Sequence, residues 1–340
     1  MKLTIWELHQ LERAPKSRRR RVLERGLSAL PLLLAVSLIL EYKLAPNFAK
    51  YAANKIAYPV GDTYTVLVGA FAAVLLVRLI FSFFSEKAYE QLIHKAPLYC
   101  TVIGILMVYD IATLKTGGLP LPYFPWVDRV LGAIVDDRKL LLDCIAHSLV
   151  LLFAGYLSGV AAGLFCGVGA GWGPRIRYWV MPVIKLLGPI PSTTWISIIL
   201  IAASSLFAGS VFMIALGVWY PVTMAAYNGV SNVDKSNFEV ARTFGVGKAG
   251  LVFKVAIPAA MPSIFNGLTQ GMGIACTALM VAEMLGVESG LGWYINWQRG
   301  WAEFAKMYAA VVIICLTFTA VNLLLTLVKK RVLRWREGNI

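Results

Sequence analysis

The sequence has few charged residues. Asp, Glu, Lys and Arg make up 15% of the 340 residues and hydrophobic residues make up 59%, whereas soluble domains carry about 25% and 45–50%. A disordered chain is excluded, because such chains are poor in aliphatic residues. A soluble enzyme is disfavoured, because its surface needs more charge. Most of the chain is therefore predicted to lie in lipid, and its length allows roughly eight spans of about 20 residues.

Cysteine and histidine are also scarce. Five Cys are too few for a secreted disulfide scaffold, and all of them lie in or beside apolar runs, where Cys acts as a small packing residue. The three His are isolated, so the sequence contains neither a metal-ligand cluster nor a Ser-His-Asp or Cys-His arrangement. We predict no catalytic residue, no metal site and no enzyme activity.

Acidic residues are outnumbered by basic ones. The chain has 18 Asp and Glu against 32 Lys and Arg, a net charge of +14. In a soluble protein this balance would favour nucleic acid as a partner. Here the basic residues gather at the chain ends and between apolar runs, as in cytoplasmic loops that face anionic lipid headgroups. We expect membrane lipid as a partner, and not nucleic acid.

Long apolar runs predict an all-α polytopic membrane protein with eight spans. The two shortest runs are 26–40, which could instead lie at the interface or form a signal-peptide core, and 96–110. The basic loops place both termini on the cytoplasmic side. The predicted spans are 26–40, 63–85, 96–110, 144–174, two within 186–233 that separate near 204–209, 255–282 and 307–328.

The cytoplasmic loop 231–258 has a pattern of its own. Ser236 and Glu239 have the spacing of a capping box at a helix N-terminus. Gly245 suits the position just after a helix C-terminus, and Pro258 would restart the chain into the next span. The pattern predicts a short helix, a turn and a second short helix.

The first of these helices carries an apolar face made of Phe238, Ala241 and Phe244. A loop between two spans has little reason to present such a face to the cytosol unless a partner docks there. The alternative is an amphipathic turn that lies on the membrane. The run Gly245-Val-Gly247-Lys-Ala-Gly250 matches a dinucleotide-binding pattern, but no strand precedes it, so we do not expect nucleotide binding.

The same loop resembles the Glu-Ala-Ala loop of permease subunits of bacterial ATP-binding cassette importers. Glu239, Ala241, Gly245 and Pro258 fall at the spacing of that motif. The segments 189–191, 282–286 and 289–292 resemble the branch of this family that imports taurine, aliphatic sulfonates, nitrate or bicarbonate. The resemblance implies a six-span type I permease core over 96–336, preceded over 1–95 by an extension with a basic cytoplasmic tail and about two extra spans.

The resemblance also implies partners. Two permease copies, as a homodimer, would line a path for a small anion across the bacterial inner membrane. The loop of each copy would dock on an ATPase dimer that binds ATP and Mg, and an extracytoplasmic binding protein would deliver the solute. The chain itself is expected to bind no cofactor, since it lacks a Gly-x4-Gly-Lys-Ser/Thr phosphate loop. The alternative class is a self-contained secondary transporter or channel, which would need a paired internal repeat and midplane carboxylates.

A stripe of small residues recurs every four positions in the span 144–174. Such a stripe lies along one side of a helix and permits close backbone approach. It would pack inside one subunit, or line the subunit interface or the path. Its members are Gly155, Gly159, Gly163, Gly167 and Gly171.

Two prolines interrupt the run that follows this span. Pro189 and Pro191 would break a continuous helix and free backbone carbonyls at membrane depth, which is tolerated where the chain lines a cavity. Ser192, Thr193 and Trp195 come directly after them. This segment is predicted to line the path or to act as a cytoplasmic-side hinge.

Ionisable residues at membrane depth are candidate functional groups. Asp110 lies toward the outer side of its span, and Glu283 lies near the outer end of span seven, beside the loop 289–292. Glu283 would gate the path or contact the binding protein, or else make a structural hydrogen bond.

Overall fold

The computed structural model describes residues 18–53 and 60–337, and all the regular elements in these ranges are helices. The chain divides into two compact units, 1–135 and 136–340. Within these described ranges, seven helices are long and apolar enough to cross a membrane. They include the two shortest predicted spans, now 26–44 and 86–115, because both helices continue through polar residues beyond the apolar runs.

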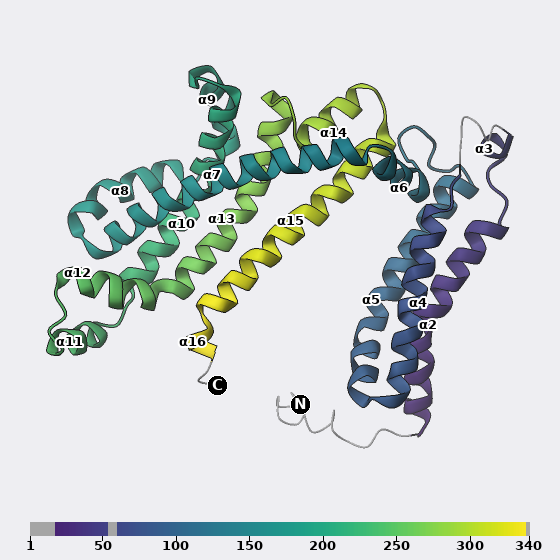
Figure 1. Cartoon of the computed structure of the whole chain (residues 1–340), viewed down its shortest axis with the longest axis horizontal. Coiled ribbons are helices and arrows are strands. Elements are labelled where there is room, and N and C mark those ends of the chain that lie inside the picture. The colour runs from purple at the N-terminus through teal and green to yellow at the C-terminus, as the bar shows by residue number, and fades with distance from the viewer. Residues whose placement is uncertain (1–17, 54–59, 338–340) are drawn as a thin grey trace, which may run out of the picture. The chain divides into compact units, whose positions relative to one another are not determined.

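The first unit is built on three long helices, α2 (Arg18–Leu44), α4 (Thr63–Phe84) and α5 (Glu86–Asp110), which pack against one another (Figure 1). A π-helical turn, η1 (Ile111–Lys115), extends α5, and the short helices α3 (Ala49–Ala53) and α6 (Val127–Asp136) complete the unit. The predicted boundary near residue 95 differs from this division, because α5 belongs to the first compact unit.

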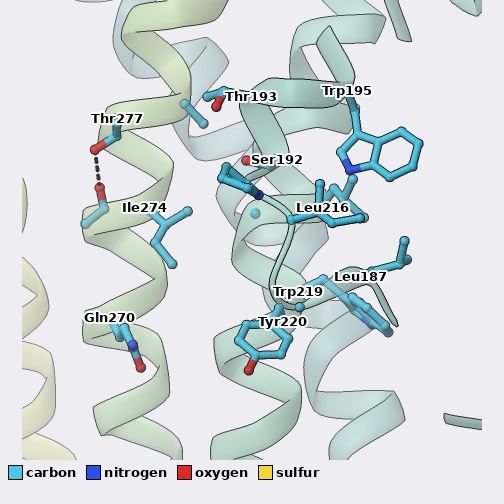
Figure 2. A pocket seen from close by; sticks show the side chains of 16 residues that line it. Leu187, Ser192, Thr193, Trp195, Leu216, Trp219, Tyr220, Gln270, Ile274 and Thr277 are labelled. Carbon is cyan, nitrogen blue, oxygen red and sulfur yellow. Dashed lines mark hydrogen bonds between the residues drawn. The ribbon is translucent and has the colours of Figure 1, made fainter. Parts of the chain in front are cut away.

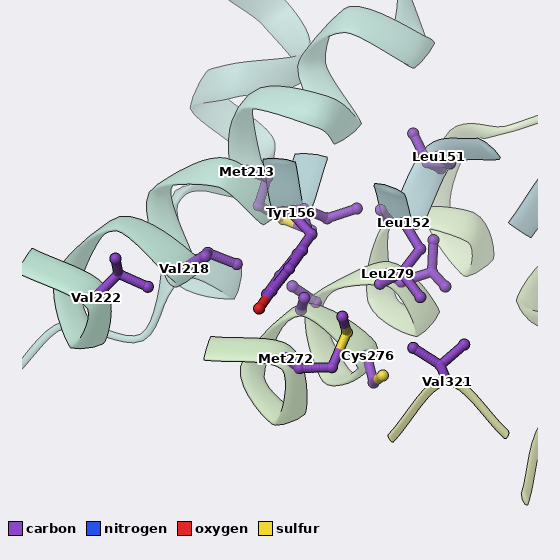
Figure 3. Packing of buried hydrophobic residues seen from close by; sticks show 14 of the residues in the cluster. Leu151, Leu152, Tyr156, Met213, Val218, Val222, Met272, Cys276, Leu279 and Val321 are labelled. Atoms are coloured by element: carbon purple, nitrogen blue, oxygen red, sulfur yellow. The ribbon is translucent and has the colours of Figure 1, made fainter. Parts of the chain in front are cut away.

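The second unit has a core of three helices, α7 (Arg138–Trp172), α10 (Leu206–Ser231) and α13 (Ile257–Gly286). Figure 3 shows the buried side chains that join them, with Tyr156 from α7 between Met213 of α10 and Met272 of α13. The Tyr156 hydroxyl donates a hydrogen bond to the backbone oxygen of Leu268 (3.0 Å). The helices α14 (Leu291–Gly300), α15 (Phe304–Val332) and α16 (Arg334–Glu337) follow.

The predicted fifth span is not a continuous helix. Between α7 and α10 the chain forms α8 (Pro174–Leu187), a break, a 3-10 turn η2 (Ser192–Trp195) and the seven-residue helix α9 (Ile196–Ala202). Pro191 stands at the break in an extended conformation, and its carbonyl accepts from the backbone N–H of Thr194 (3.0 Å). The count of eight continuous spans therefore becomes seven long helices and one interrupted segment.

The glycine stripe of α7 faces α10 of the same chain. A Cβ atom on Gly159 would lie 2.6 Å from the backbone oxygen of Ala215, and one on Gly167 would lie 2.5 Å from that of Thr223. The other three stripe positions would meet branched side chains of α10 at similar distances. The observed arrangement favours the packing interpretation over a subunit interface. At the three stripe positions that meet branched side chains, Gly155 faces Ile214, Gly163 faces Val222 and Gly171 faces Val230.

Candidate functional site

The first helix of the loop 231–258 begins differently from the prediction. It is α11 (Lys235–Thr243), and its N-cap is Asp234, whose carboxylate accepts from the backbone N–H of Ser236 (3.2 Å). The predicted capping box is wrong, because Asp234 supplies the cap two residues earlier. Ser236 is thus the second residue of the helix, and Glu239 is exposed on it.

The same helix ends at Gly245. The Gly245 N–H donates to the carbonyl of Arg242 (2.9 Å), and the Val246 N–H donates to that of Ala241 (3.1 Å). These two bonds form a Schellman motif, which needs a residue of positive φ at its C′ position. Gly245 has φ +75°, and a Cβ there would meet no atom within 4 Å. The glycine is therefore needed for its backbone conformation and not for space.

The second helix of the loop is not separate from the membrane helix. A short turn, α12 (Lys248–Gly250), continues through the π-helical η3 (Leu251–Ala256) directly into α13. Pro258 is the second residue of α13, directly after the π-helical turn η3; having no backbone N–H, it donates no hydrogen bond to that turn. Pro258 therefore stands at the start of the next membrane helix as predicted, but the second loop helix runs into that helix without a break.

The loop presents a different apolar face from the predicted one. Phe238 packs on its own chain, with its ring 5.7 Å from that of Trp172, and Ala241 is half-buried. Phe244 is 81% exposed, and so are Phe253 (71%) and Val240 (57%). We call Val240, Phe244 and Phe253 the loop surface. The sequence missed Phe253 because it belongs to the π-helical turn, whose register differs from that of an α-helix.

A cavity of about 440 Å³ lies beside the broken segment (Figure 2). Pro191, Ser192, Thr193 and Trp195 of the predicted path segment line it, but Pro189 is not among its lining residues. The remaining walls are the end of α8, α10 and α13, whose polar side chains were not predicted. These are Trp219 and Tyr220 from α10, and Gln270 and Thr277 from α13.

The cavity wall carries hydrogen-bonding groups but no fixed charge. Its lining contains no Asp, Glu, Lys, Arg or His among the described residues. Gln270 and Thr277 are seven residues apart on α13, so they share one face of that helix. Gly217 of α10 makes room for Ser192, since a Cβ there would lie 2.8 Å from the serine hydroxyl. The cavity is therefore lined by apolar side chains and a few uncharged hydrogen-bonding groups.

Glu283 joins three elements of the second unit. Its side chain is buried (1% exposed). The Ser148 hydroxyl of α7 donates to its Oε1 (2.6 Å), and the backbone N–H of Gly292 donates to its Oε2 (2.8 Å). Ser148 in turn accepts from the N–H of Leu291 (2.9 Å). This arrangement favours the structural interpretation of Glu283 over a gate that contacts solute.

A second carboxylate fixes the start of α7. Asp137 accepts from the Tyr294 hydroxyl (2.7 Å) and pairs with Lys306 (3.0 Å). Burial raises the pKa of Asp137, but the hydrogen bonds from Tyr294 and Lys306 outweigh it, so the net shift of this pKa is downward. The ionised Asp137 carboxylate therefore links the start of α7 to Tyr294 of α14 and to Lys306 at the start of α15.

We expect Glu283→Ala to destabilise the second unit. The change leaves the Ser148 hydroxyl and the Gly292 N–H without their acceptor. Each buried donor without a hydrogen-bond partner lowers the free energy of unfolding by about 1–3 kcal/mol. Glu283→Gln keeps an acceptor oxygen and should cost less. Thermal unfolding of the purified chain in detergent measures both. Equal stability of Glu283→Ala and wild type would contradict the anchoring role.

The loop helix α11 and the helix α14 lie at opposite ends of the second unit (Figure 1). The long apolar helices among the described residues define a polytopic membrane protein. Residues 159–335, more than half of the chain and all within the second unit, match the family described as binding-protein-dependent transport system inner membrane component. The chain belongs to this family: it is a permease component of an ATP-binding cassette importer, a multi-pass and non-enzymatic subunit.

Named relatives agree with this membership. The chain is 30% identical over 184 residues to an aliphatic sulfonates transport permease, SsuC of Bacillus subtilis, covering 54% of this chain and 67% of the relative. It is 25% identical over 191 residues to the taurine permease TauC of Escherichia coli (56% and 70% covered). It is 27% identical over 188 residues to the nitrate import permease NrtB of Leptolyngbya laminosa (55% and 67% covered).

A similar solved structure is the methionine importer MetNI in inward-facing conformations. The match has 18% identity and a TM-score of 0.49, and it covers 58% of this chain and 98% of that chain.

Proposed function

We propose that the chain forms the translocation path for a small anion and couples it to a separate ATPase through the loop surface. The observation that supports this proposal most is that the side chains of Phe244 and Phe253 are exposed and not covered by other helices of the chain. Buried aromatic anchors supply much of the energy of protein interfaces. In this proposal the ATPase dimer binds ATP and Mg, and the loops of two permease copies dock on it.

The cavity beside Pro191 is the proposed part of the path. Its hydroxyl, indole and amide groups can hold an anion by hydrogen bonds, and the absence of fixed charge in its lining allows release. The relatives named above are permeases for aliphatic sulfonates, taurine and nitrate, which supports a sulfonate, taurine or nitrate as the solute, while bicarbonate rests on the sequence resemblance alone. An extracytoplasmic binding protein would select among them.

The proposed arrangement has both termini and the loop surface on the cytoplasmic side. Basic residues at both chain ends and in the loop support it, because cytoplasmic segments carry an excess of Lys and Arg. A second copy of the chain would complete the path.

Replacing both exposed loop aromatics tests the docking. We expect Phe244→Ser with Phe253→Ser to weaken binding of the ATPase about 30–1,000-fold, since each lost anchor costs about 1–2 kcal/mol and the two together cost about 2–4 kcal/mol. The folded chain should persist, because neither side chain is buried. Phe207→Ser, at the other end of α10 and 47% exposed, is the matched control.

Co-purification and ATP-dependent uptake of each of the four anions should be measured together, with the cognate binding protein present. Unchanged ATPase binding by the double variant would refute docking at the loop surface. Uptake of none of the anions by an intact complex would refute the substrate class alone.

A further inference from the structure

Arg78 is the charged side chain of an otherwise uncharged membrane helix in the first unit. It lies in α4, whose sequence contains no other Asp, Glu, Lys or Arg. Arg78 is exposed, and its neighbours on the same face of the helix, Val74 and Phe81, are exposed as well. A charged side chain at membrane depth is costly unless it meets a partner of opposite charge. Arg78 therefore needs an anionic partner on the exposed face of α4.

The hydroxyl of Tyr99 on α5 holds the Arg78 side chain in place. The guanidinium donates through Nη1 to the Tyr99 hydroxyl oxygen (3.3 Å), and the Tyr99 ring packs edge-on against the Phe71 ring (centroids 5.7 Å apart). The two helices lie side by side (Figure 1) and run in opposite directions, since Ser85 alone joins them. Helical side chains lean toward the N-terminus of their own helix, so Arg78 and Tyr99 lean toward each other.

The described part of the chain offers Arg78 no carboxylate as an ion-pair partner. The acids at the start of α5, Glu86 and Glu90, precede Tyr99 by thirteen and nine residues. At about 100° per residue they lie on the opposite side of that helix. Lys95, four residues before Tyr99, is exposed on the same side as Tyr99. The surroundings of Arg78 are therefore positively charged.

The sequence of α5 indicates the depth of this contact in the membrane. Residues 86–95 include several ionisable side chains, whereas 96–109 include no charged residue. The boundary between the headgroup region and the hydrocarbon therefore falls near Lys95. Tyr99 is four residues further on, which is about 6 Å along the helix. Arg78 can reach the headgroups from this depth, because long basic side chains extend toward the interface.

The groups at this place match the two parts of a phospholipid. The guanidinium presents a planar fork of N–H donors that suits phosphate oxygens. The Tyr99 hydroxyl accepts from Arg78, so its own O–H can donate to a phosphate. The exposed side chains of Val74 and Phe81 offer an apolar surface to an acyl chain.

We propose that Arg78, Tyr99 and Lys95 bind the phosphate group of an anionic phospholipid whose acyl chain lies along α4. Two basic side chains without a neighbouring acid favour a headgroup that carries no cation of its own. Phosphatidylglycerol therefore fits this site better than phosphatidylcholine. The site is independent of the proposed transport function, since all its residues lie within 1–135.

Native mass spectrometry of the full-length chain, taken from membranes of equal phosphatidylglycerol and phosphatidylcholine content, tests the site. We expect the wild type to retain phosphatidylglycerol preferentially and Arg78→Gln to lower this preference about fivefold, since one basic residue is lost. Tyr99→Phe keeps the ring beside Phe71 and should lower it about twofold. Lys87→Gln is the matched control and should leave it unchanged, because Lys87 is exposed about 120° around α5 from Tyr99.

Thermal unfolding in each lipid separates lipid binding from folding. Phosphatidylglycerol should stabilise the wild type relative to phosphatidylcholine. Arg78→Gln should lose this difference and should match the wild type in phosphatidylcholine, because its side chain is exposed.

Four results would overturn the proposal. Equal lipid preference of wild type and Arg78→Gln would show that Arg78 binds no lipid. Equal loss in Arg78→Gln and Lys87→Gln would indicate general attraction by basic residues. Displacement of phosphatidylglycerol by inorganic phosphate would identify a site for a free anion. Unchanged lipid binding with weaker self-association of Arg78→Gln would assign this face of α4 to a second copy of the chain.

Discussion

Gly245→Val is expected to abolish solute uptake while the protein still inserts into the membrane. A β-branched residue at φ +75° is strained, and its cost of roughly 1–2 kcal/mol is comparable with the roughly 1–3 kcal/mol that the two turn hydrogen bonds contribute. The Schellman motif would open, and α11 would change its angle to η3. The loop surface would then lose its shape, because Phe244 and Phe253 lie on opposite sides of this turn.

Gly247→Val is the matched control for this experiment. Gly247 lies two residues further on, has an ordinary φ of −70°, and also has open space where a Cβ would go. Uptake and ATPase activity in reconstituted vesicles, at equal amounts of inserted protein, measure both variants. Wild-type uptake by Gly245→Val, or equal loss in both variants, would refute a backbone role for Gly245 in coupling.

Alanine in the glycine stripe is expected to destabilise the second unit strongly. A Cβ at Gly159 or Gly167 would overlap backbone atoms of α10, which cannot rotate away as a side chain can. Overpacking of this kind costs about 1–3 kcal/mol for each site. The two positions contact different residues of α10, so the costs of Gly159→Ala and Gly167→Ala should add in the double variant.

Gly69→Ala serves as the control, since Gly69 is also helical and nothing lies within 4 Å of an added Cβ. It should leave stability unchanged or raise it slightly, because Ala favours helix over Gly by about 1 kcal/mol. Thermal unfolding in one detergent compares all variants. Equal stability of Gly159→Ala, Gly167→Ala and Gly69→Ala would show that α7 and α10 do not pack as described.

The membrane helices could be predicted because lipid demands long apolar runs, which are a local property of sequence. Their ends could not, since helices such as α5 continue into polar residues where backbone hydrogen bonding still favours them. The boundary at 135 was also missed. It depends on α5 packing with α2 and α4, and this choice of neighbour is tertiary.

The loop shows the same division between local and distant causes. Gly245 could be predicted because a C′ position imposes its own backbone conformation. The N-cap was misplaced, since both Asp234 and Ser236 are good caps and the sequence alone does not rank them. Phe238 was predicted to face a partner protein, but its ring packs against the ring of Trp172, which lies 66 positions earlier in the chain.

The unbroken run of helix from the loop into the membrane has a mechanical consequence. Residues 248–285 form one helical rod of 38 residues, about 57 Å long at 1.5 Å per residue. Phe253 lies near one end of this rod and Glu283 near the other. In the proposed coupling, a tilt imposed at Phe253 would be carried along this helix to Glu283 and to the α14 segment that Glu283 holds. The π-helical turn at Leu251–Ala256 is the natural bending point, so its stiffness would set how much of the tilt is transmitted.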